Sequence, residues 1–282
     1  MAPKVVLITG ASSGIGLALA ELLAKSKEYT VIATARKPEV INAKGEAGGF
    51  HVKQLDVTDD TSVHKCISDT IKDHGRLDCL INNAGFGTQQ NVEQMSYKDH
   101  EALFQTNYFG VVRMLKESLP HMRAAGKGQV IITTSLVGFS AFPFTDAYSA
   151  SKFALEGLAE AMAPQLSKFG ISMSLVEPGP VSTPFMENID KNTAPAQESA
   201  AKEPSDDYTA LKEAFWGAMM SKMSTDISQT PEEVAEVFKQ AVDDPKPHLR
   251  YQTSDYVREA AERKFKDATG DSHVQGMLKI LG

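Results

Sequence analysis

The chain has 282 residues, with 29 Lys plus Arg against 36 Asp plus Glu and a formal net charge of -7. Hydrophobic residues make up 42% and charged residues 23%, which is typical of a folded, water-soluble protein and excludes collagen-like, disordered and membrane-embedded chains. The acidic balance, without any run of basic residues, also excludes nucleic acid as an electrostatically bound partner.

Short apolar runs rich in β-branched residues predict strands at residues 5–9, 29–35, 52–55, 77–81, 129–134, 171–176 and 249–251. Amphipathic stretches between them predict helices at residues 16–25, 61–72, 99–124 and 150–169. Strands that are apolar almost throughout are typical of a parallel sheet covered on both faces. The alternating order therefore predicts an α/β fold with a doubly wound, Rossmann-type parallel sheet.

No linker divides this alternation, so residues 1–282 are expected to form a single domain. The composition changes near residue 187, where small, charged and proline residues without periodicity precede a Met-rich amphipathic stretch at 208–223. We interpret residues 187–230 as a flap on the substrate side. A further helix is expected from Pro231 to about residue 242, with Thr230 as its N-cap.

The two cysteines, Cys66 and Cys79, match neither a CxxC pair nor a metal-ligand spacing, so we expect no disulfide framework and no metal site. Such usage is typical of a reducing compartment. The first apolar run, at residues 5–8, is too short for a signal peptide or a transmembrane segment. We therefore expect a cytoplasmic protein with no transmembrane segment.

A glycine-rich loop joins the first strand to the first helix. At such a junction, free helix N–H groups and the close approach that glycine allows favour a dinucleotide diphosphate. The spacing is G-x-x-x-G-x-G rather than the usual G-x-G-x-x-G, and a tight strand-helix turn is the alternative. The residues expected to bind the cofactor here are Gly10, Ser12, Ser13, Gly14, Ile15 and Gly16.

The end of the second strand indicates which dinucleotide binds. An acidic residue that would read the ribose of NAD is absent, and Arg36 follows Ala35 instead. A guanidinium there, with the hydroxyl of Ser12, favours the 2′-phosphate of NADP(H), although a solvated basic pair with Lys37 is the alternative. Asp56, after the third strand, could accept from the adenine amino group or could cap the turn before Thr58.

Tyr148 and Lys152 lie four residues apart, which places them on one helical face. An adjacent cation favours phenolate, so Tyr148 could exchange a proton with an alcohol or a ketone. By itself such a pair is usually a surface contact. Ser135 supports the chemical interpretation because it follows an apolar strand, at the sheet edge where parallel α/β proteins bind ligands.

Two asparagines, Asn83 and Asn107, are further candidates for the site. Asn83 comes directly after the strand at 77–81, and Asn107 lies within a predicted helix, where asparagine is a mediocre helix former. Asn107 is either an exposed polar group or an amide that links water and Lys152 in a proton relay.

Together these segments resemble the short-chain dehydrogenase/reductase family: residues 9–16, 82–85 (Asn-Asn-Ala-Gly), Asn107, Ser135, 148–152 (Tyr-Ser-Ala-Ser-Lys) and 178–179 (Pro-Gly). The resemblance implies an NAD(P)-dependent enzyme on a Rossmann-type sheet. It implies that Tyr148 is the general acid/base, that Lys152 lowers its pKa and binds the nicotinamide ribose, that Ser135 positions the carbonyl and that Asn107 supports the relay. It also assigns cofactor contacts to Val57, Asn83, Ala84, Gly85, Pro178, Gly179, Val181 and Thr183, as well as to Tyr148 and Lys152.

Residues 142–157, 178–181, 231–237 and 249–253 resemble more narrowly the branch of estradiol 17β-dehydrogenase type 1 and photoreceptor-type retinol dehydrogenases. That branch tends to prefer NADP(H), in agreement with Arg36. Around residues 216–220 this chain has methionines where the estradiol enzymes carry a histidine that grips the steroid, which puts estradiol itself in doubt. An apolar cleft for a steroid or retinoid is expected from Phe142, Phe144, Phe185, Met186, Phe215, Trp216, Met219 and Met220, each of which could instead be core.

The sequence thus predicts an NADP(H)-dependent oxidoreductase that interconverts an alcohol and a carbonyl on a bulky apolar substrate, such as a 17β-hydroxysteroid or retinol/retinal. The alternatives are a carbonyl reductase for other small carbonyls, a non-catalytic NADP(H) sensor, and an epimerase or dehydratase of nucleotide sugars, which the apolar flap disfavours. The resemblance also implies a homodimer, packed through the helices predicted at 99–124 and 150–169.

Overall fold

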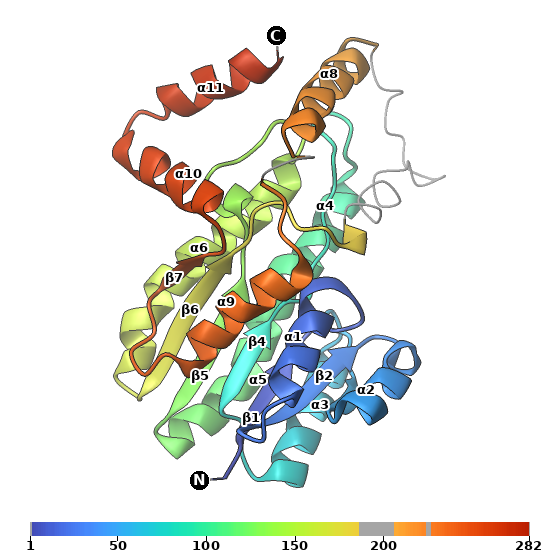
Figure 1. The fold of residues 1–282 in the computed structure, drawn as a ribbon, viewed down its shortest axis with the longest axis vertical. Helices are drawn as coiled ribbons and strands as arrows, with labels where there is room; N and C mark the ends of the chain where they lie inside the picture. Colours follow the sequence, from blue (N-terminus) through green and yellow to red (C-terminus); the bar gives the residue numbers. More distant parts are fainter. Residues whose placement is uncertain (1, 186–205, 224–226, 282) are drawn as a thin grey trace.

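A parallel sheet of seven strands forms the centre of the computed structural model, which describes residues 2–185, 206–223 and 227–281 (Figure 1). The strands are β1 (Lys4–Ile8), β2 (Tyr29–Ala35), β3 (His51–Gln54), β4 (Cys79–Asn82), β5 (Gly128–Thr133), β6 (Ile171–Glu177) and β7 (Arg250–Gln252). Their order is β3-β2-β1-β4-β5-β6-β7, and each neighbouring pair is parallel. Every predicted strand is present, and the predicted fold class is confirmed.

Helices cover both faces of the sheet because its central strands, such as β1, β4 and β5, are buried along almost their whole length. The helices α1 (Gly14–Ala24) and α9 (Pro231–Asp243) pack on one face, around the buried Leu19, Leu23 and Phe238. The helices α3 (Asp60–His74), α5 (Gly110–Ala125) and α6 (Asp146–Ser167) pack on the other, around Ile67, Met114 and other buried side chains. The direction of winding changes between β1 and β4, and a crevice at the carboxyl edge is expected at such a point.

Three differences from the predicted helices stand out. The stretch predicted as one helix at 99–124 is α4 (Tyr97–Phe104), a π-helical turn (Gln105–Phe109) and α5. The helix predicted at 150–169 begins earlier, at Asp146, so Tyr148 lies inside its first turn. The helices α2 (Asn42–Gly48), α10 (Asp255–Lys266) and α11 (Asp271–Leu281) were not predicted; α2 is short and α10 is strongly polar.

Helices α8 (Asp206–Met223) and α11 lie beyond the carboxyl ends of the strands, at the top of Figure 1. They pack together around Phe144, Phe215 and Met219, with Met277 and Ile280 from α11. Of the predicted flap, residues 187–205 and 224–226 lie outside the described residues. Within the part of the chain that is described, no helix combines the length and apolar character needed to cross a bilayer.

Candidate active site

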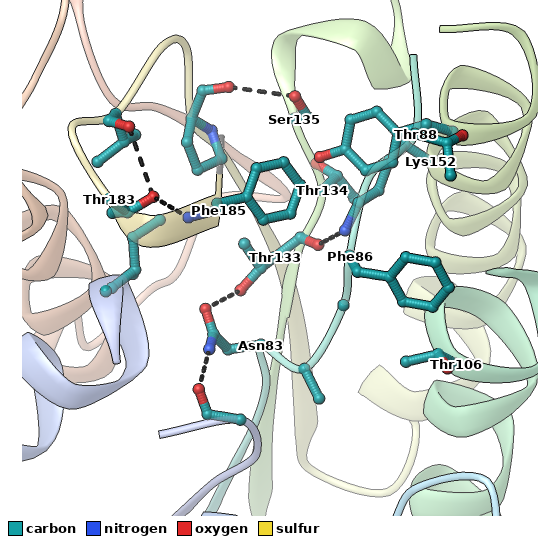
Figure 2. A pocket seen from close by; sticks show the side chains of 18 of the residues that line it. Asn83, Phe86, Thr88, Thr106, Thr133, Thr134, Ser135, Lys152, Thr183 and Phe185 are labelled. Carbon is teal, nitrogen blue, oxygen red and sulfur yellow. Dashed lines mark hydrogen bonds between the residues drawn. The ribbon is translucent and has the colours of Figure 1, made fainter. Parts of the chain in front are cut away.

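A cavity of about 1020 Å³ opens at the carboxyl edge of the sheet, beside the crevice between β1 and β4. Figure 2 shows side chains pointing into it, among them Asn83 and Ser135, which follow β4 and β5, and Lys152 from α6. The sequence-predicted residues that line it are Gly10, Ser12, Ser13, Gly14, Ile15, Arg36, Asp56, Val57, Asn83, Ala84, Gly85, Ser135, Tyr148, Lys152, Pro178, Gly179, Val181 and Thr183. Gly16 and Asn107 are not among the lining residues.

The glycine loop is built for close backbone packing. Gly10 and Gly14 have φ of 68° and 58°, in the left-handed region that side chains rarely adopt. A Cβ on Gly10 would lie 2.7 Å from the Cα of Ala84, and one on Gly16 would lie 2.5 Å from the carbonyl oxygen of Gly10. Gly16 therefore packs against the loop, while Gly10, Ser12, Ser13, Gly14 and Ile15 line the cavity.

Two polar side chains fasten this loop to the end of β4. The buried Thr9 hydroxyl accepts hydrogen bonds from the main-chain N–H groups of Asn83 and Ala84, at 2.9 and 3.0 Å. The Asn83 side-chain amide donates to the carbonyls of Thr9 and Gly10, each at 3.1 Å. These bonds hold the start of the glycine loop and the segment after β4 at a fixed separation.

At the far end of the cavity, β2 ends at Ala35 and the exposed Arg36 follows it. Asp56 accepts from the N–H and the hydroxyl of Thr58, at 2.9 and 2.7 Å, so the turn-capping interpretation of Asp56 is confirmed. Burial opposes its ionisation, but the bonds from Thr58 and the nearby guanidinium of Arg36 keep the pKa of Asp56 below its usual value. Because Arg36 and Asp56 both line the cavity, this end carries charges of both signs.

The central group consists of Ser135, Tyr148 and Lys152. The Lys152 ammonium donates to the carbonyl oxygen of Thr133 at 2.8 Å and lies 5.8 Å from the centroid of the Tyr148 ring (Figure 2). The Ser135 side chain accepts from the N–H of Val137 and donates to the carbonyl of Pro178 at 3.5 Å. Helix α6 thus presents the phenol and the ammonium beside the hydroxyl that follows β5.

Burial dominates the titration of this group. It raises the pKa of Tyr148 to about 12, although the Ser135 hydroxyl opposes the rise. It also lowers the pKa of Lys152 to about 8, against the favourable charge of Glu156. Desolvation thus outweighs the Ser135 hydroxyl at Tyr148, and the effect of Lys152 on the pKa of Tyr148 stays a prediction.

Asn107 lies in the π-helical turn and is 1% exposed, so the interpretation of an exposed helix residue is wrong. Its Oδ1 atom accepts from the N–H of Phe86 at 3.0 Å, and its Nδ2 atom donates to the Phe86 carbonyl at 2.9 Å and to the Ser151 hydroxyl at 3.1 Å. A Cβ on Gly85 would lie 3.2 Å from Asn107 Oδ1. Asn107 thus fixes the segment that passes in front of Lys152.

The apolar wall is smaller than predicted. Phe142, Phe185 and Trp216 line the cavity, and the Tyr148 and Phe185 rings lie 5.8 Å apart. Phe144, Phe215 and Met219 belong instead to the buried cluster under α8 and α11. Met186 lies outside the described residues, as does the side chain of Met220.

Further lining residues were not singled out from the sequence: Phe86, Thr88, Gln89, Ala102, Gln105, Thr106, Thr133, Thr134 and Thr145. Several follow directly after the motif that ends in Gly85 or stand directly before Ser135. Distance along the chain from these two motifs is the signal that could have identified them.

Comparison with known proteins agrees with this geometry. The model of the short chain dehydrogenase family matches residues 4–194. The human retinol dehydrogenase 8 is 38% identical over 99% of this chain and 91% of that protein. The human 17-beta-hydroxysteroid dehydrogenase type 1 is also 38% identical, over 98% of this chain and 85% of that protein.

Solved structures show the same architecture. A short-chain dehydrogenase from Streptomyces avermitilis superimposes with a TM-score of 0.76 at 29% identity, covering 99% of this chain and 97% of that one. ElxO, solved with NADP bound, gives 0.70 at 26% identity, covering 89% and 98%. A short chain dehydrogenase/reductase from Burkholderia phymatum, in complex with NAD, gives 0.79 at 22% identity over 94% of each chain, which shows the fold alone. Similar structures therefore hold either dinucleotide.

Proposed function

Since the chain belongs to the short-chain dehydrogenase family, we propose that it is an NADP(H)-dependent oxidoreductase for a bulky apolar substrate. As a family member it is an oxidoreductase that acts on alcohol and carbonyl groups. The observation that carries the finer proposal is that Ser135, Tyr148 and Lys152 share one cavity with the glycine loop and Arg36. A hydride donor and a carbonyl oxygen could meet there.

The residues present fit a dinucleotide. Gly10, Ser12, Ser13 and Gly14 line the cavity at the N-terminus of α1, where N–H groups and the helix dipole favour an anion such as a diphosphate. Arg36 and Ser12, at the rim of the same cavity, would hold the 2′-phosphate that distinguishes NADP(H) from NAD(H). We expect Asn83, Gly85, Pro178 and Thr183, which line the same cavity, to flank the nicotinamide half.

The bound dinucleotide would supply or accept the hydride, and the side chains would handle the proton and the developing charge. During reduction, the hydroxyls of Tyr148 and Ser135 would donate to the carbonyl oxygen, where negative charge accumulates. The Tyr148 O–H bond then breaks and its proton passes to that oxygen, leaving a phenolate beside the Lys152 ammonium. This proton is present at neutral pH, as it also is at the ordinary pKa of tyrosine, so the phenol can donate it to the carbonyl oxygen.

Lys152 and Asn107 would act in support. The bond to Thr133 holds the ammonium at the end of β5, within reach of both Tyr148 and a nicotinamide ribose. Both side-chain amide hydrogens of Asn107 are donated to Phe86 and Ser151. A proton relay through Asn107 would therefore use its main-chain groups, while its side chain keeps the relay in place.

The substrate class follows from the wall of the cavity and from the relatives. Phe142, Phe185 and Trp216 form an apolar side near Tyr148, which suits a large hydrocarbon skeleton with few polar atoms. The two relatives that are 38% identical carry names that state retinol and 17-beta-hydroxysteroid as substrates. We propose a steroid or a retinoid on this basis.

A homodimer is part of the proposal. Phe109, before α5, and Phe153, in α6, are 43% and 42% exposed, on the two helices expected to pair across a two-fold axis. Sedimentation velocity at micromolar concentration should give twice the chain mass of 30.6 kDa. A protein that sediments as a monomer would contradict the homodimer and would leave the proposed activity unaffected.

The first experiment follows nicotinamide absorbance with purified protein, comparing NADPH with NADH over steroid ketones, retinaldehyde and simple aromatic carbonyls. We expect turnover of one bulky apolar class with a preference for NADPH. Turnover limited to simple carbonyls would favour a general carbonyl reductase, and a preference for NADH would contradict the role of Arg36. Binding of NADPH without turnover would favour a sensor.

A further inference from the structure

Two buried glutamates share one arginine on the side of Lys152 that faces away from the cavity. Glu156 lies one helical turn after Lys152 in α6, and Glu177 is the last residue of β6. The Arg250 guanidinium, at the start of β7, lies 3.1 Å from Glu156 Oε2 and 3.2 Å from Glu177 Oε1. Glu177 is fully buried and Glu156 is 7% exposed.

The charges of this cluster do not balance. Arg250 also pairs with Glu160 at 2.6 Å, but that carboxylate is 57% exposed and is stabilised by water. Glu156 and Glu177 would together place two buried negative charges beside one guanidinium, and the charge of Glu156 rather than that of Glu177 acts on the Lys152 ammonium. The remaining neighbours are uncharged: Gln252, which donates to Glu177, Thr134, and the Phe265 ring of α10 under Arg250.

Hydrogen bonding indicates how the excess charge is removed. The Oε1 atoms of Glu156 and Glu177 are both buried and receive no hydrogen bond, yet the two carboxyl groups lie within hydrogen-bonding reach of each other. One proton on either carboxyl would give the pair a hydrogen bond that two carboxylates cannot form, because a protonated carboxyl can donate. Burial first, and the proximity of Glu156 second, raise the pKa of Glu177 to about 8, and burial also raises that of Glu156.

The pair is connected to both strand ends that form the site. Glu156 contributes a favourable charge to the Lys152 ammonium, which holds Thr133. Glu177 precedes Pro178, whose carbonyl accepts from the Leu136 N–H at 2.8 Å and from the Ser135 hydroxyl. A change of charge or position at the two glutamates would therefore reach both Lys152 and Ser135.

We propose that Glu156 and Glu177 hold a single shared proton and, as positioning residues of the reaction, thereby set the charge and place of Lys152. The pair keeps one negative charge next to Lys152, which favours the ammonium form that the phenolate of Tyr148 requires. This inference rests on the proposed function for its catalytic consequence, whereas the shared proton itself does not depend on any substrate.

Thermal unfolding against pH tests the shared proton. The folded pKa of Glu177 lies above its ordinary value of 4.5, so its contribution to stability is present at low pH and is lost as the pH rises through about 8. Glu177→Gln cannot ionise. The melting temperature of the variant minus that of the wild type should therefore increase by roughly 5 °C when the pH is raised from about 5 to about 9.

Glu160→Gln, which removes the exposed partner of the same arginine, is the matched control and should run parallel to the wild type. Parallel curves for Glu177→Gln and the wild type would overturn the proposal. If Glu177→Gln does not fold, Glu156→Gln gives the same test, since a single carboxyl beside Arg250 no longer needs a proton and the pH dependence should flatten.

The pH dependence of kcat tests the effect on Lys152. In Glu156→Gln the single negative charge of the pair lies on Glu177 and no longer acts on Lys152 from position 156, so the alkaline limb should move to lower pH by about one unit. Glu160→Gln should keep the wild-type profile, and a purely structural effect would lower kcat without moving the limb. An alkaline limb that does not move in Glu156→Gln overturns the proposal. A wild-type protein without any turnover refutes the proposed function instead, and the unfolding curves then still test whether Glu156 and Glu177 share a proton.

Discussion

The side chain of Lys152 bonds to the main chain of Thr133, with 2.8 Å between the ammonium nitrogen and the carbonyl oxygen. This bond ties α6, which carries Tyr148, to the end of β5, which leads into Ser135. The phenol and the hydroxyl therefore keep their relative positions when either element moves. Fixed donor positions are what stabilise an oxyanion effectively, because no reorganisation is needed during the reaction.

Replacing Tyr148 by phenylalanine removes the proton donor and keeps the ring that packs near Phe185. We expect kcat for carbonyl reduction to fall by at least about 100-fold. The Kd for NADPH, measured by fluorescence titration, should stay close to the wild-type value. Retained turnover would show that another group supplies the proton.

Lys152→Met should abolish turnover without loss of stability at neutral pH. The folded pKa of Lys152, about 8, lies below its ordinary value of 10.5, so the buried ammonium penalises the folded state below about pH 8, and this penalty disappears as the pH rises toward 10.5. The melting temperature of the variant should equal or exceed that of the wild type at pH 7, with a margin that shrinks above pH 8. A margin that grows with pH would contradict the assignment.

Arg36→Ala should weaken NADPH selectively. Removal of the guanidinium should raise the KM for NADPH by about 10-fold or more and leave the KM for NADH nearly unchanged. Lys37→Ala is the matched control, because Lys37 is exposed and does not line the cavity. Equal effects of the two substitutions on KM would mean that only the overall positive charge matters.

Gly10→Ala should damage both stability and dinucleotide binding. Its φ of 68° and the 2.7 Å approach to Ala84 predict a loss of about 1–3 kcal/mol in the free energy of unfolding. Gly49, with φ of 76° and no atom within 4 Å of the added Cβ, provides the control for backbone strain alone. Chemical denaturation should show a smaller loss for Gly49→Ala, and its NADPH affinity should remain unchanged.

Much of this molecule could be predicted from its sequence. Alternating apolar strands and helices specify the sheet, and the glycine loop and the Tyr148–Lys152 spacing lie on elements whose ends must meet at one edge. Local periodicity did not reveal the π-helical turn around Asn107, because the extra residue is stabilised by tertiary bonds to Phe86 and Ser151. It also could not separate Trp216, which lines the cavity, from Phe215, its neighbour in the core.

The pKa shifts of the site residues also could not be predicted from the sequence. Spacing shows that Tyr148 and Lys152 are neighbours, but the burial that raises one pKa and lowers the other depends on how the segment after Gly85 and the end of β5 enclose them. The same holds for Glu156 and Glu177, which lie in different elements and come together only when β6 and α6 pack.

The close approach of Gly10 to Ala84 has a consequence for biosynthesis. The diphosphate loop leaves the ribosome early, yet its shape depends on Thr9 and Gly10 bonding to Asn83, which lies in the segment after β4. A nascent chain cannot complete this loop until β4 has emerged and docked beside β1. We therefore expect ribosome-bound chains to acquire affinity for NADPH only after this docking, so that the dinucleotide selects chains whose two sheet halves have already joined.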